Sequence, residues 1–81
     1  MAALTPTSTQ VISLGNVIGI LGTFSAINDA DTWAPGLVTV MGATVTNGAN
    51  DVDTGATYSG GTVIVQSAGA LANAKVLAIG T

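Results

Sequence analysis

The scarcity of charged side chains is the feature of this sequence that most limits what the chain can fold into. Only 6% of the 81 residues are charged, namely four aspartates and one lysine. A typical soluble protein has about 25% charged residues. The other polar residues are mostly Thr, Ser, Asn and Gly, which cost far less to desolvate than charges when a partner hydrogen-bonds them. The composition therefore predicts a surface that neighbouring molecules largely cover.

Chain length leads to the same expectation. A chain of 81 residues forms one domain at most and buries only roughly 60–65% of the surface that its unfolded form exposes. Small domains usually gain stability from disulfides, a metal or oligomerisation. The sequence has no cysteine and no histidine, which excludes disulfides, thiolate ligands and the commonest transition-metal ligand. We therefore expect the chain to associate with itself as a homo-oligomer.

The residue pattern predicts an all-β fold. Val, Ile and Thr favour strands, and pairs such as Gly15-Asn16 and Gly60-Gly61 indicate tight turns between them. About six or seven short strands at this spacing are typical of a small antiparallel β-sandwich or barrel. We expect residues 11–81 to form this single domain and residues 1–10 to form an extended N-terminal arm. The predicted strands are Val11–Leu14, Val17–Phe24, Thr32–Ala34, Leu37–Thr46, Ala56–Ser59, Thr62–Ser67 and Lys75–Ile79.

The segment Leu37–Thr46 has the clearest strand pattern. Simple alternation places Val38 and Val40 on one face and Met41, Ala43 and Val45 on the other. Gly42 interrupts the run, and an isolated glycine in a strand indicates a bulge or a close backbone approach.

Several functions are poorly supported by the available side chains. General acid–base catalysis at neutral pH uses a histidine, or a carboxylate or lysine with a shifted pKa, and the chain has no histidine. We therefore assign no catalytic residue, no cofactor and no enzymatic activity. A single lysine, Lys75, cannot neutralise a row of phosphates or bind an anionic membrane surface.

Four aspartates form the candidate metal site. Asp29 and Asp31 lie in one polar loop, and Asp51 and Asp53 in another. Their simplest role is that of turn residues in solvent. Alternatively, because oxygen ligands at alternate positions suit calcium, they form a calcium site if the two loops meet. That alternative describes a calcium-assisted binding module, such as a receptor-contact domain.

A second alternative rests on the apolar segment Val11–Ile27. Its length is close to the roughly 20 residues that span a bilayer, and Gly15 and Gly19 have the spacing that brings membrane helices together. The corresponding function is a membrane-embedded or filament coat subunit. No lysine or arginine flanks the segment, so membrane insertion is the less favoured interpretation.

Candidate contact residues come from the arm and from one aromatic residue. Phe24 and Trp33 suit a core, but Trp33 lies next to Pro35-Gly36 at a predicted sheet edge, and tryptophan is enriched at interfaces. We therefore expect Trp33 to contact a partner. The predicted interface comprises Thr5, Pro6, Thr7, Ser8, Thr9 and Gln10 of the arm, with Trp33 and Leu37 at the edge.

Several short fragments resemble a known family. They are Gly15-Asn16, Gly22-Thr23-Phe24, Thr32-Trp33 before Gly36-Leu37, Ser59-Gly60-Gly61-Thr62-Val63 and Ala78-Ile79-Gly80. Together they resemble the small β-rich virion proteins that tailed bacteriophages encode near their capsid genes. The resemblance implies a capsid decoration or cement protein on the virion surface, dimeric or trimeric, without a cofactor. It also implies a major capsid protein as partner. Under the calcium alternative, the chain is instead a tail or receptor-contact module of the same kind of particle.

Overall fold

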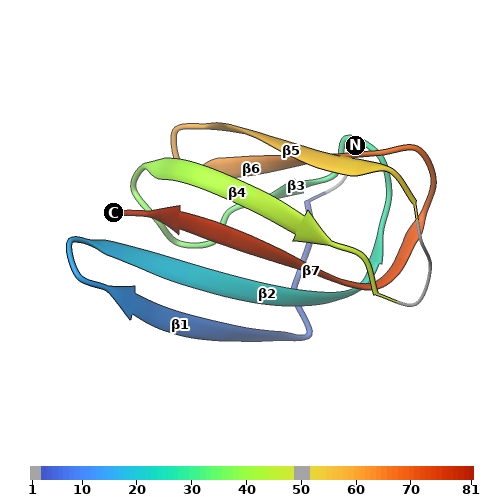
Figure 1. The fold of residues 1–81 in the computed structure, drawn as a ribbon. Helices are drawn as coiled ribbons and strands as arrows, with labels where there is room; N and C mark the ends of the chain where they lie inside the picture. The colour runs from blue at the N-terminus through green and yellow to red at the C-terminus, as the bar shows by residue number, and fades with distance from the viewer. Residues whose placement is uncertain (1–2, 49–51) are drawn as a thin grey trace.

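The computed structural model describes residues 3–48 and 52–81 and shows an all-β fold. These residues form seven strands and no helix, so the predicted small β-sandwich is confirmed (Figure 1). The strands are β1 (Ser8–Leu14), β2 (Val17–Ile27), β3 (Thr32–Trp33), β4 (Val40–Thr46), β5 (Thr54–Ser59), β6 (Thr62–Ser67) and β7 (Leu71–Gly80).

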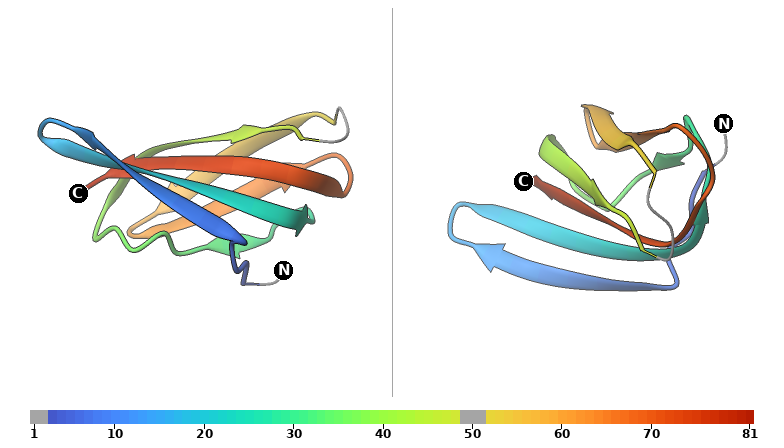
Figure 2. Two further views of the ribbon diagram at one scale, coloured as in Figure 1. Left: turned by 90° about the horizontal axis from the view of Figure 1, so that it is seen from below. Right: turned by 45° about the vertical axis from the view of Figure 1, so that its right-hand side comes forward.

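Two antiparallel sheets face each other. One sheet has the order β1-β2-β7-β4 and the other has the order β3-β6-β5. The C-terminal strand β7 is therefore central, with β2 on one side and β4 on the other. Strand β1 lies beyond β2 at the edge of the larger sheet (Figure 2).

Two tight hairpins have glycine at the turn. Leu14 pairs with Val17 across Gly15-Asn16, and Gly15 has a φ of 80°. Ser59 pairs with Thr62 across Gly60-Gly61, and Gly60 has a φ of 58°. A positive φ at the first turn position but not at the second is typical of a type II′ turn, which matches the twist of the flanking strands. The turns predicted at these two pairs are therefore present.

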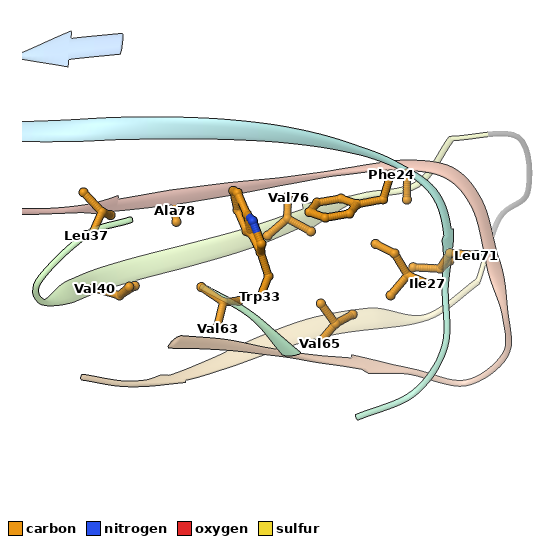
Figure 3. Packing of buried hydrophobic residues seen from close by; sticks show 11 residues of the cluster. Phe24, Ile27, Trp33, Leu37, Val40, Val63, Val65, Leu71, Val76 and Ala78 are labelled. Atoms are coloured by element: carbon orange, nitrogen blue, oxygen red, sulfur yellow. The ribbon is translucent and has the colours of Figure 1, made fainter. Parts of the chain in front are cut away.

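The core lies between the two sheets and contains the aromatic rings of Phe24 and Trp33 (Figure 3). Phe24 on β2 and Trp33 on β3 meet edge to face, with ring centroids 5.2 Å apart and an interplanar angle of 81°. Such aromatic pairs contribute about 0.5–1.5 kcal/mol beyond the area that they bury. The aliphatic part of the core comprises Ile27, Leu37, Val40, Val63, Val65, Leu71, Ala74, Val76 and Ala78.

Strand β4 contains a bulge where Gly42 interrupts the pattern. Val40 pairs with Gly80 and Gly42 pairs with Ile79, so Met41 is the extra residue. The predicted bulge is confirmed, but the predicted division of faces is wrong. Val40 is buried, Ala43 and Val45 pack against the same core, and Met41 is exposed. The bulge adds one residue and thereby reverses the alternation.

The N-terminal segment lies against its own chain. Ala3 forms a parallel bridge with Thr32, the Leu4 amide donates to the Thr32 carbonyl at 2.7 Å, and the Leu4 side chain packs against the core. Ser8–Leu14 then forms β1, which starts three residues before the predicted first strand.

The hypothetical membrane helix at residues 11–27 is wrong. This segment contains most of β1, the Gly15-Asn16 turn and β2. A glycine with positive φ and many β-branched residues favour a hairpin over a helix. Within the part of the chain that the structure describes, no helix has the length and apolar character needed to cross a membrane.

Candidate interaction surface

Large apolar side chains are exposed in one half of the molecule. Val11 is 71% exposed and Val38 is 83% exposed. Scattered exposed hydrophobic residues are ordinary, whereas a cluster of them indicates a binding surface. We call this cluster the apolar end; it comprises Val11, Ile12, Leu14, Ile18, Val38, Met41 and Tyr58.

The side chains of the apolar end come from three parts of the sequence, which come together at Gly80. Gly80 pairs with Ile18 on β2 and with Val40 on β4, and the Val40 amide donates to the Gly60 carbonyl at 2.7 Å. The β1–β2 turn, the start of β4 and the β5–β6 turn therefore meet near the C-terminus (Figure 1). A Cβ atom on Gly80 would collide with the Thr39 carbonyl oxygen, so this close meeting requires glycine.

The β1–β2 hairpin exposes apolar side chains on both of its faces. Val11 lies opposite Ile20 of β2, and Ile18 lies opposite Ser13 of β1. Both side chains therefore lie on the face of the hairpin that continues the core side of the sheet. Ile12 and Leu14 lie on the opposite face. All seven residues of β1 are exposed, because the smaller sheet does not extend over this strand. The hairpin therefore presents apolar side chains to solvent on both faces, which is typical of a surface that binds a partner.

The described acidic side chains lie at the opposite end of the strands. The Asp29 Oδ1 atom accepts a hydrogen bond from the Ser67 amide at 2.9 Å, and the Asp31 Oδ2 atom accepts one from the Asn28 amide at 2.8 Å. The Asp53 carbonyl accepts from the Ala68 amide at 3.0 Å. We call this region, Asp29, Asp31 and Asp53, the acidic end.

The described aspartates lie in turns, as expected, but the expectation that their side chains lie in solvent holds for only some of them. Asp29 and Asp53 are exposed, but Asp31 is only 4% exposed and is not a solvated side chain. Asp51 lies outside the described residues. Among residues 3–48 and 52–81, no three acidic side chains approach closely enough to hold a metal ion together.

A polar pocket lies on the larger sheet, over the start of β1 and the facing parts of β2 and β7. It has a volume of about 360 Å³ and is lined by Ser8, Thr9, Gln10, Leu21, Thr23 and Lys75. Next to it, the Thr7 amide and hydroxyl both donate to the Thr23 carbonyl, at 2.7 Å and 3.1 Å. The pocket therefore contains three of the arm residues predicted to make contacts, together with the one lysine.

The structure separates the predicted contact residues into two groups. Thr5, Thr7, Ser8, Thr9 and Gln10 are exposed, and Pro6 is half-buried. Trp33 is 3% exposed and Leu37 is 9% exposed. The expectation that Trp33 and Leu37 face a partner is wrong, because both side chains fill the core of their own chain.

Sequence reasoning missed the apolar end. The signal was present in the uncharged, apolar segment Val11–Leu14, which suggested an ordinary strand or part of a membrane helix but not an exposed apolar surface. Val38 and Met41 could not be identified, because their exposure depends on the bulge and on the loop before β4.

Fold and surface together describe a small β-sandwich with an apolar end, an acidic end and one exposed edge strand. No family model, no curated protein and no solved structure matches this chain.

Proposed function

We propose that this chain is a structural protein of a virus particle, specifically a decoration or cement protein on the outer surface of a capsid. The observation that supports the proposal most directly is the apolar end, with exposed Val11, Ile12, Leu14, Ile18, Val38, Met41 and Tyr58 on a chain of only 81 residues. An exposed cluster of this kind favours a permanent partner over a free existence in water.

The low charge supports a contact with a large, repeated protein surface. The apolar end contains no charged side chain, while the three described aspartates lie at the other end. Interface cores are depleted of charge and rich in apolar and aromatic side chains. The apolar end has this composition, and Tyr58 and Met41 are residue types that interfaces favour.

The architecture suits a protein that stabilises a capsid shell by binding to it. A sandwich with a packed core holds the hairpin and the loop before β4 in fixed relative positions through Gly80. A preorganised surface loses less conformational entropy on binding than a flexible one. The function therefore needs no catalytic group: the chain contributes apolar area and shape to the shell.

The copy number of the chain in purified virions provides the first test. Mass spectrometry of particles of the virus that encodes this chain is expected to find it in a simple integer ratio to the major capsid protein. Cryo-electron microscopy of the same particles should show the sandwich on the shell exterior. The proposal is wrong if the particles lack the chain or carry it only at the tail.

A single substitution tests the surface. In Val38→Lys, a charge replaces the most exposed large apolar side chain. Because burying an unpaired ammonium is costly, we expect binding to shells that lack the chain to weaken by about tenfold or more, which corresponds to about 1.4 kcal/mol. Gln66→Lys is the matched control, because Gln66 is exposed on β6, outside the apolar end. Equal binding by both variants would exclude the apolar end as the contact.

A further inference from the structure

Among residues 3–48 and 52–81, four strands lie at sheet edges, and other parts of the chain lie against three of these edges. Strand β3 has only two residues, and Ala3 and Leu4 bond to its Thr32. Strands β4 and β5 lie side by side, and β4 also has the Met41 bulge. Natural sheets use short strands, bulges and covering segments in this way to prevent association through their edges.

Strand β1 lacks every one of these protections. Its seven residues, Ser8–Leu14, are all exposed and contain no charge, no proline and no bulge. Within the described chain, β1 pairs with β2 on one side and with no strand on the other. A long, uncharged edge strand of this kind is a template for pairing with another strand.

The hairpin register determines which backbone groups of β1 point to the open side. Residues that flank a two-residue turn exchange both backbone hydrogen bonds, and every second residue along the strand repeats this. Leu14 flanks the turn, so Leu14, Ile12, Gln10 and Ser8 bond to β2. At the other side of the sheet, Thr39 and Thr81 also exchange both backbone hydrogen bonds. Counting the alternation across the sheet from this pair gives the same bonded residues in β1. The amides and carbonyls of Thr9, Val11 and Ser13 therefore point outward.

From this geometry we infer that β1 pairs antiparallel with β1 of a second copy, with Val11 opposite Val11 on the two-fold axis. The inference deepens the proposed function by naming one partner of the chain. In this register Thr9 lies opposite Ser13 of the other copy, so the outward-pointing groups of the two strands match. The result is one continuous eight-stranded sheet with the order β4-β7-β2-β1-β1-β2-β7-β4.

The distribution of side chains favours a second copy as the occupant. The outward-pointing residues are self-complementary, with valine opposite valine and hydroxyl opposite hydroxyl. No charge lies on β1, and the two acidic ends point in opposite directions along molecules that are 34 Å long. That length exceeds the screening distance of about 8 Å at physiological salt, so the net charge of −3 on each copy does not oppose pairing.

The pairing also ends at two copies. It uses the one uncovered edge of each described chain, and a two-fold interface is closed. Leu14, Ile18, Val38, Met41 and Tyr58 remain available in each copy, and the two apolar ends point in opposite directions. Such a dimer can contact two neighbouring shell subunits, which is how a cement protein would link them.

The native mass of the full chain tests the dimer. Light scattering coupled to size exclusion is expected to give twice the chain mass of 7.8 kDa. Val11→Lys places two like charges opposite each other on the axis, so it should raise the dimer Kd by about tenfold or more. The Gln66→Lys variant adds the same charge on β6 and should stay dimeric. A wild type with the mass of one chain, or an assembly that Val11→Lys leaves intact, would overturn the inference.

A cysteine variant tests the register even if Val11→Lys fails to fold. The chain has no cysteine, and hydrogen-bonded antiparallel partners have Cα atoms about 5.5 Å apart, a distance that suits a disulfide. Val11→Cys should form a covalent dimer under mild oxidation at least about tenfold faster than Gln66→Cys, since pairing raises the local thiol concentration. Equal rates would exclude pairing centred on Val11. Val38→Lys should keep the dimer while losing shell binding, so failure of this inference and failure of the proposed function are distinguishable.

Discussion

The position of the Trp33 indole depends on the absence of a side chain at Gly22. Gly22 lies in the middle of β2, on the face that the core covers, between Ile20 and Phe24. A Cβ atom there would lie 2.8 Å from Trp33 Cζ2 and 2.9 Å from Phe24 Cε1. Both rings are buried and rigid, so neither can move away without opening the core.

We expect Gly22→Ala to lower the free energy of unfolding by about 1–3 kcal/mol, the usual cost of overpacking a core. Urea denaturation followed by Trp33 fluorescence measures this. The control is Gly19→Ala on the outer face of the same strand, where the nearest atoms are Leu14 Cδ1 at 3.5 Å and Leu77 Cδ1 at 3.6 Å. It should change stability by less than about 0.5 kcal/mol. Equal effects of both variants would contradict the packing described for Trp33.

Among the elements, β7 and β1 have opposite roles in the same sheet. Strand β7 pairs along its length with β2 and, from Lys75 to Gly80, with β4, and its Leu71, Ala74, Val76 and Ala78 are buried. Strand β1 pairs with β2 alone and is exposed throughout. The first strand therefore contributes exposed surface, whereas the last strand joins β2 to β4 in the larger sheet and supplies side chains to the core.

Two matched leucine substitutions separate these roles. Leu71→Ala removes a fully buried side chain from β7 and should cost about 2–5 kcal/mol of stability. Leu14→Ala removes a half-exposed side chain at the end of β1 and should cost less than about 1 kcal/mol. Thermal melts followed by circular dichroism give both values. A larger loss from Leu14→Ala would mean that β1 belongs to the stabilising core.

Over the whole molecule, polarity changes along the strands. The molecule measures 34 × 21 × 19 Å, and its apolar end and acidic end lie at opposite ends of the long dimension (Figure 1). At the acidic end, Asp29 and Asp31 accept hydrogen bonds from backbone amides of Ser67 and Asn28. The Asp29 bond connects the β2–β3 loop to the end of β6, and the Asp31 bond lies within that loop.

Calcium should have little effect on the folded chain. Because the Asp29 and Asp31 carboxylates already accept backbone hydrogen bonds, we expect the melting temperature to be the same with millimolar calcium and with a chelator. Any ion that binds the native state at 100 times its Kd would add about 2.7 kcal/mol of stability. Differential scanning calorimetry would detect such a shift. A melting temperature that rises with calcium would show that these loops bind the ion.

The sequence by itself determined the class of fold. Branched residues separated by glycine turns at Gly15 and Gly60 predict short antiparallel strands, because strand and turn preferences are local properties of the backbone. The bulge at Gly42 was predictable for the same reason. In β6 the alternation of Val63, Ile64 and Val65 puts both valines on one face, and that face is buried, since β6 runs without interruption between β3 and β5.

Only the tertiary structure decided which apolar side chains are buried. Trp33 and Val38 are both apolar, yet one fills the core and the other is exposed. The difference depends on contacts between distant residues, such as Trp33 with Gly22 and Val40 with Gly80 and Gly60. Burial is set by such long-range packing, which local sequence patterns do not specify, so the apolar end and the open edge of β1 emerged only from the folded chain.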